Sequence, residues 1–106
     1  MNLSFGTYDY PAIGTVEADG TNFLEKILSE GKRARQIVIY VNNYKNATVL
    51  FNGQVRSPDR FINGQAEYFY RHVGTSLTSN GKKEYGGIES AIVKGQGVTF
   101  RAKIST

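Results

Sequence analysis

The stretch Arg35–Gly53 constrains the fold most, because it holds two apolar runs separated by a short polar break. The runs, Gln36–Val41 and Ala47–Phe51, are rich in the β-branched and aromatic residues that fit the packed surface of a pleated sheet. The break, Asn42–Asn46, is rich in Asn, which tolerates the positive φ of hairpin loops. This pattern predicts a central hairpin. Its first strand is expected to be covered on both faces, because nearly every position after Gln36 is apolar.

Alternating segments on both sides of this stretch predict further strands. Asn63-Gly64 is typical of a tight hairpin turn and leads into the strand-like segment Gln65–Val73. A second hairpin is expected from Ile88 to Ile104, with its turn at Lys94–Gly97. The chain is therefore expected to be all-β, an antiparallel β-sandwich or a jelly-roll-like barrel of six to eight short strands.

The N-terminal part of the chain gives weaker patterns. Alternation around Leu3–Thr7 suggests a short strand that Pro11 would close, and Ala12–Ala18 suggests another, followed by a turn at Asp19-Gly20. We expect one domain over residues 15–106, since 106 residues are typical of a single core. Residues 1–14 are either an arm that lies along a neighbouring subunit or the first strand of the same sandwich.

A short helix is expected near residues 22–30. Asn22 is a suitable N-cap, Glu25 stands where a capping box needs it, and Gly31 suits the C-terminus. Four apolar residues recur between these ends at helical spacing: Phe23, Leu24, Ile27 and Leu28. The alternative is an irregular or extended segment that places Leu24 and Leu28 in the core.

The side chains that most catalytic sites use are scarce. The chain has no cysteine, which excludes disulfides, thiolate metal sites and thiol catalysis. His72 is the single histidine, so a histidine metal cluster is excluded as well. The nine carboxylates are scattered, and no phosphate-binding loop or nucleophile motif is present. We therefore expect a protein that is not an enzyme and that uses no cofactor or metal.

Two segments are candidates for contact with a partner. The basic run Lys32, Arg33, Arg35 leads into the central strand; it is either a solvated strand entrance or a contact with an acidic surface. The polar, Gly-rich segment Gly74–Gly87 is expected to be a long exposed loop, and it carries Lys82, Lys83 and Tyr85.

Charge and aromatic content leave nucleic-acid binding open as an alternative. The net charge of +4 is modest, yet seven Tyr and six Phe lie among thirteen basic residues. Tyr68, Tyr70 and His72 share one predicted strand face and form a candidate stacking row, with Arg71 beside it for phosphates. The competing interpretation is that these aromatic residues are core.

No stretch approaches the roughly 20 apolar residues of a membrane span, and the N-terminus lacks the features of a signal peptide. We therefore expect a soluble protein made in the cytoplasm, with no membrane partner.

The order of these segments resembles a family of viral proteins. The segments KRARQIVIYVNN and ATVLFNG, an I-N-G-Q step into a strand, and IESAIVKGQGVTFRAKI together resemble small all-β accessory proteins of tailed-bacteriophage virions. The resemblance covers roughly Leu24 to Ile104. It implies a homo-oligomeric virion protein, made in the host cytoplasm, that decorates or stabilises the capsid or a head–tail or tail junction.

Within this hypothesis, the expected contact residues with other virion proteins are Tyr8, Tyr10, Lys32, Arg33, Arg35, Lys82, Lys83 and Tyr85. A carbohydrate- or receptor-binding β-sandwich is a third hypothesis, motivated by tyrosines around the long loop.

Overall fold

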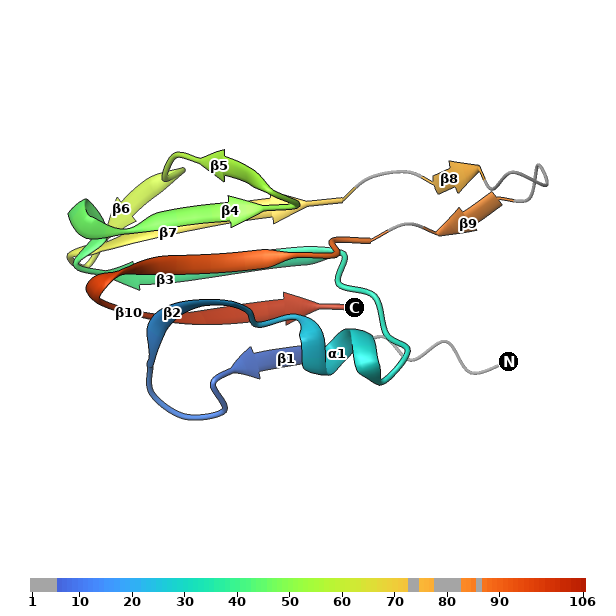
Figure 1. Cartoon of the computed structure of the whole chain (residues 1–106), viewed down its shortest axis with the longest axis horizontal. Helices are drawn as coiled ribbons and strands as arrows, with labels where there is room; N and C mark the ends of the chain where they lie inside the picture. The colour runs from blue at the N-terminus through green and yellow to red at the C-terminus, as the bar shows by residue number, and fades with distance from the viewer. Residues whose placement is uncertain (1–5, 73–74, 78–82, 86) are drawn as a thin grey trace.

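The computed structural model describes residues 6–72, 75–77, 83–85 and 87–106, with side chains for 6–72 and 87–106. It confirms the all-β class: eight strands form one antiparallel sheet that curls into a half-barrel (Figure 1), and two more strands form a separate pair. The strands are β1 (Thr7–Tyr10), β2 (Val16–Asn22), β3 (Gln36–Asn42), β4 (Thr48–Phe51), β5 (Gln54–Arg56), β6 (Arg60–Ile62), β7 (Gln65–Arg71), β8 (Thr75–Leu77), β9 (Lys83–Tyr85) and β10 (Ala91–Ser105).

The strand β10 is central to the sheet, because four other strands pair with it. Its first part pairs with β4 and its last part with β3, while β2 and β1 pair along its other side. Between these parts the strand bends at Gly95 and Gly97, whose φ values of 149° and 69° favour glycine. The predicted strands on either side of Lys94–Gly97 are therefore present, but the predicted hairpin is wrong. The two parts pair with different neighbours and form a β-arch (Figure 1).

The central stretch forms a second arch that follows the first. β3 pairs with β10 and β7, whereas β4 pairs with β10 and β5, so both edges of each strand are taken. The predicted pairing of Gln36–Val41 with Ala47–Phe51 is therefore wrong, although both segments are strands. A short 3-10 turn, η1 (Tyr44–Asn46), replaces the expected hairpin loop between them.

Burial along β3 also differs from the prediction. Ile37, Ile39 and Val41 are fully buried, whereas Val38 and Tyr40 on the other face are only half-buried. One face of β3 lies in the core of the half-barrel, and no described element packs over the other. The continuous apolar run of β3 therefore has one face completely buried in the core and one face that is only partly buried.

Tight turns join the short edge strands. Asn63 and Gly64, with φ of 52° and 75°, connect β6 to β7 as the sequence predicted. Asn52 and Gly53, with φ of 49° and 79°, connect β4 to β5 in the same way. The β4–β5 hairpin was not predicted from the sequence, although the same Asn-Gly pair marks its turn.

The predicted helix is confirmed as α1 (Glu25–Ser29). Gly31, with φ of 78°, ends it in a Schellman motif: Gly31 N–H donates to Leu28 O, and Lys32 N–H to Ile27 O. The Asn22 side chain does not complete a capping box with Glu25. Its Oδ1 accepts hydrogen bonds from the backbone N–H groups of Leu24 (3.1 Å) and Ala91 (3.0 Å), which ties the helix to the start of β10.

The N-terminal strands are shifted relative to the predictions. Of residues 1–14, Thr7–Tyr10 form β1 and pair with β10 of the same chain, from Thr7 opposite Ser105 to Tyr10 opposite Ala102. Most of the predicted strand Leu3–Thr7 lies outside the described residues, and its last residue, Thr7, is the first residue of β1. β2 starts four residues later than expected, and Asp19-Gly20 lies within it, next to a shift in its register with β10.

The segment 74–87 holds more regular structure than the expected loop. β8 and β9 pair antiparallel, from Thr75 opposite Tyr85 to Leu77 opposite Lys83. This pair lies beyond the ends of β7 and β10 (Figure 1).

The core fills the inside of the half-barrel. Its largest fully buried side chains come from five segments: the residue before α1, β3, β4, the bridge residue Ile88 and β10. They are Leu24, Ile37, Ile39, Val41, Val49, Phe51, Ile88, Val93, Val98 and Ile104.

Candidate functional site

A groove between β1 and α1 is lined by two of the predicted contact residues, and a third, Lys32, bonds to one of them. It has a volume of about 370 Å³, and Tyr8 and Tyr10 of β1 form one wall. Lys26 and Glu30 of α1 stand at the other side, and the floor is apolar, with Phe23, Ile27 and Ile104 almost fully buried. An apolar concavity with a few polar groups at its rim is the usual form of a binding site.

The third predicted residue, Lys32, holds the Tyr8 wall in place. Lys32 Nζ donates to the Tyr8 hydroxyl and also lies 4.7 Å from the centre of its ring. The hydrogen bond to Tyr8 is the main cause that raises the pKa of Lys32 above its usual value of 10.5. Glu30 Oε2 lies 3.7 Å from the same ammonium, so the rim of the groove is close to neutral here.

Tyr10 is fixed by aromatic packing. Its ring stacks on Phe23, with centroids 5.3 Å apart and planes 16° apart, and lies 5.9 Å from the ring of Phe100. These contacts join β1, β10 and the segment before α1, so the tyrosine wall is rigid. A preorganised aromatic wall lowers the conformational entropy that this protein itself loses on binding a partner.

Among the described strands, none pairs with the backbone of β1 on the side away from β10. Thr106 N–H donates to Gly6 O, and Arg35 N–H donates to Ser105 O on the β3 side. Since alternate residues of an antiparallel strand face opposite neighbours, Tyr8 and Tyr10 face β10, and Thr7 and Asp9 face away. Within the described ranges, β10 is the only strand beside β1, and β1 lies at the lower edge of the sheet in Figure 1.

The other predicted contact residues do not join this groove. Arg33 is exposed beside Gly87, and Arg35 is half-buried with its backbone bonded to Ser105 and His72. Lys82 lies outside the described residues. Lys83 and Tyr85 lie on β9, and their side chains fall outside the described residues as well.

The residues of the nucleic-acid alternative divide between the core and the surface. Tyr68 is only 3% exposed, and burial raises the pKa of its hydroxyl above 10.0. Tyr70 is half-buried between the ring of Phe51, 4.8 Å away, and the guanidinium of Arg56, 5.3 Å away. Arg71 is exposed, and His72 is half-buried, with its backbone N–H bonded to Arg35 O. Tyr68 and Tyr70 therefore belong to the core side of β7 and do not form an open stacking row.

A second surface, at β5 and β6, was not predicted from the sequence. These two strands end the main path of the sheet and lie at its upper edge in Figure 1. Three apolar side chains on them are exposed: Val55 (67%), Phe61 (62%) and Ile62 (37%). The Phe61 ring packs against the ring of Tyr44 in η1, with the two ring centroids 4.9 Å apart. We call Val55, Phe61 and Ile62 the apolar edge.

The apolar edge also has free backbone groups. In a hairpin with a two-residue turn, the residues flanking the turn bond to each other and the next pair faces outward. Val55 and Phe61 hold this outward position in their hairpins, so their N–H and C=O groups point away from the sheet. The sequence carries no signal for this edge, because which strands end a sheet depends on the strand order.

The only buried charge among the described side chains lies next to this edge. Glu67 is 8% exposed, and its Oε2 lies 3.0 Å from Arg60 Nε. That oxygen has no aligned hydrogen bond, so the contact is an ion pair without good hydrogen-bond geometry. The pairing makes β6 electrically neutral beside its apolar side chains.

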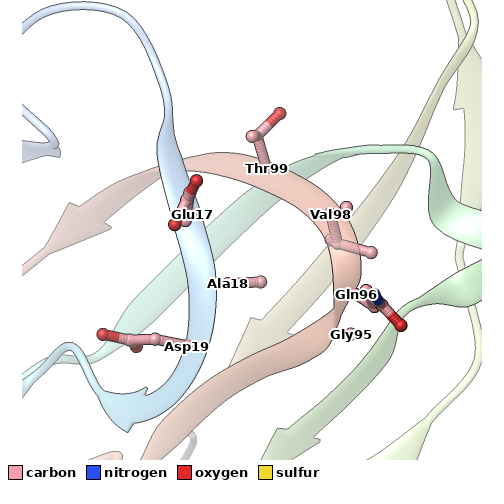
Figure 2. Close-up of a pocket in the computed structure, with 8 residues that line it drawn as sticks. Glu17, Ala18, Asp19, Gly95, Gln96, Val98 and Thr99 are labelled. Atoms are coloured by element: carbon pink, nitrogen blue, oxygen red, sulfur yellow. The ribbon is translucent and has the colours of Figure 1, made fainter.

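A further hollow, of about 290 Å³, lies between β2 and the bend of β10 (Figure 2). Ala18 points toward the bend, whereas Asp19 points away from it. The Asp19 carboxylate accepts hydrogen bonds from Thr21 N–H (3.0 Å) and from its hydroxyl (2.7 Å), and the hydroxyl bond is the main cause that lowers the pKa of Asp19. Asp19 lines the hollow, but its carboxylate is already bonded within β2 to Thr21, two residues further along the chain.

In the part of the chain that the structure describes, no three His, Asp or Glu side chains stand close enough to hold a metal ion. No helix there has the length and apolar character needed to cross a membrane. No protein-family model, curated protein or solved structure matches the chain.

Proposed function

We propose that this chain is a structural subunit of a bacteriophage virion, which decorates or stabilises the capsid or a head–tail or tail junction through repeated protein–protein contacts. The proposal includes a role without catalysis, a homo-oligomeric state and a location in the virion. It rests on the resemblance of the sequence segments to small virion accessory proteins and on the surfaces described above.

One observation carries the contact role: in the part of the chain that the structure describes, edge strands in two different places have no strand partner on one side. One is β1 with its aromatic groove, and the other is the apolar edge at β5 and β6. Free strand edges with exposed apolar residues promote association, and proteins that stay monomeric usually protect them. A subunit that meets one kind of neighbour on each side needs two such surfaces.

The particle composition tests this function. We expect mass spectrometry of purified particles from the source to find the chain in many copies per particle, and absence of the chain would refute the proposal. Among variants, Phe61→Ser is expected to lower incorporation into particles, because it removes the largest apolar side chain of the exposed edge. The matched control is Ile13→Ser, which alters a side chain that is 92% exposed but lies outside both surfaces.

A specific observation also supports the nucleic-acid alternative. The outer face of β7, β3 and β10 carries Phe69, which is 38% exposed and lies across Val38 from Lys103. On the same face, the guanidinium of Arg101 lies 4.2 Å from the ring centre of Tyr40. Aromatic and basic side chains on an open sheet face suit a single strand. Binding of oligonucleotides at low salt that Phe69→Ala weakens would favour this alternative, and no binding at low salt would refute it.

A further inference from the structure

We propose that two copies of the chain pair through the free edge of β1, so that the sheet of one copy continues into the sheet of the other. The inference rests on the proposed function, because it names the partner at the groove between β1 and α1 as a second copy. It follows from the backbone of β1, from the register that its side chains allow and from the groove beside it.

The free backbone groups fix the spacing of the pairing. Thr7 and Asp9 direct their N–H and C=O groups away from β10, and an added antiparallel strand must bond to these two residues. A second β1 offers the same two residues. Two copies related by a twofold axis can therefore pair in any register that places Thr7 or Asp9 of one copy opposite Thr7 or Asp9 of the other.

Three such registers exist, and the side chains distinguish them. One places Asp9 opposite Asp9 of the second copy, which sets two carboxylates side by side. Another places Thr7 opposite Thr7 and leaves Asp9 without a partner in β1 of the second copy. The third places Thr7 opposite Asp9 in both directions and Tyr8 opposite Tyr8. It allows four backbone hydrogen bonds and avoids opposing charges.

The third register also suits the groove. Side chains directly opposite each other point to the same face, so Tyr8 of the second copy lies on the groove side of the sheet. Close aromatic pairs across antiparallel strands are favourable, and the register also places the large side chain of Tyr10 opposite Gly6. Each Lys32 ammonium near the axis has Glu30 3.7 Å away, which limits repulsion between the two copies.

The end of β1 limits the length of the ladder between the two copies. Pro11 follows directly, and proline has no N–H to donate, so the added ladder ends there. A foreign extended peptide could use the same backbone groups, but it would need no twofold register. A second copy satisfies all four bonding positions with residues that the chain itself provides.

Sedimentation equilibrium of the full chain over a wide concentration range tests the pairing. Asp9→Pro removes an outward N–H without touching the bonds to β10, and we expect it to raise the dimer dissociation constant roughly tenfold or more, since two intermolecular hydrogen bonds are lost. Asp9→Ala keeps the N–H and is expected to leave dimerisation within a few-fold of wild type. Val55→Pro makes the same change on the other edge, and we expect it to leave the dimer unchanged.

Circular dichroism and thermal unfolding establish that each variant is folded. Thr7→Pro alters the other residue whose backbone faces away from β10, and it replaces Asp9→Pro as the test variant if Asp9→Pro does not fold. A wild-type chain that stays monomeric at all concentrations would overturn the inference, as would a dimer that Asp9→Pro and Asp9→Ala affect equally. A monomer found in purified particles would refute the pairing alone, whereas a β1 dimer absent from particles would refute the proposed function alone.

Discussion

Replacement of Gly95 by alanine should destabilise the protein strongly, and more than the same replacement at the turn residue Gly64. Gly95 lies at the bend of β10 and has a φ of 149°, a backbone conformation that residues other than glycine rarely adopt. A Cβ there would overlap the carbonyl oxygen of Asn46 in η1 and would lie 2.8 Å from Val98 Cγ2. The obstacle is largely backbone, so it cannot move aside as a flexible side chain would.

The magnitude follows from two contributions. The unfavourable backbone conformation costs about 1–2 kcal/mol, and the overlap with Asn46 and Val98 adds about 1–3 kcal/mol. We therefore expect Gly95→Ala to lower the free energy of unfolding by about 3 kcal/mol. For a domain of this size, that loss lowers Tm by roughly 12 °C or more.

Urea denaturation of Gly95→Ala and of a matched variant, Gly64→Ala, measures this difference. Gly64 also has a positive φ, of 75°, but a Cβ there meets no atom within 4 Å. Gly64→Ala is expected to cost about 1 kcal/mol from conformation alone. If Gly95→Ala cost no more than Gly64→Ala, the close approach of the β10 bend to η1 would be refuted, and with it the double arch.

Two further predictions concern residues inside the fold. Asn22→Ala removes both the acceptor for the Leu24 and Ala91 N–H groups and the Nδ2 donor to Glu89 O, and should lower the free energy of unfolding by about 2 kcal/mol. Asn22→Asp loses only the donor and should cost less; equal losses in urea denaturation would contradict the role of Oδ1. Burial raises the pKa of Tyr68 above 10.0, so its contribution to stability is fully present below about pH 10 and is lost as pH rises through the raised pKa. Tyr68→Phe should therefore flatten the alkaline fall of Tm, and a slope identical to that of wild type would show that Tyr68 does not titrate in this way.

The sequence predicts strands well where local chemistry decides them. Asn63-Gly64 forms its hairpin because both residues accept positive φ, and Gly31 ends α1 for the same reason. Ile37, Ile39 and Val41 are buried as expected from their type. These features depend on neighbours a few residues away along the chain.

Pairing depends on distant contacts, and here the sequence was misleading. Two strands joined by a short polar segment can form a hairpin or an arch, and the residues of Asn42–Asn46 suit both. β10 decides the outcome, because it supplies a partner for β3 at one end and for β4 at the other. Gly95 and Gly97 looked like turn residues, but they bend one strand between two layers instead.

The candidate site was predicted in part. Tyr8, Tyr10 and Lys32 were expected to contact a partner, and the structure places them around one groove. Their convergence could not be foreseen, because it requires α1 to fold back beside β1. The sequence placed Phe61 in a hairpin and assigned Val55 to no strand. It revealed the exposure of neither, since exposure at a sheet edge follows from strand order, which depends on distant contacts.

A cryo-electron microscopy map of the purified particle, at side-chain resolution, would test the proposed subunit role and both of its contact surfaces at once. We expect symmetric copies of this half-barrel in the virion, with β1 against β1 of a second copy and the apolar edge of Val55, Phe61 and Ile62 covered by another virion protein. A particle without this chain, or copies whose β1 and apolar edges both face solvent, would contradict the proposal.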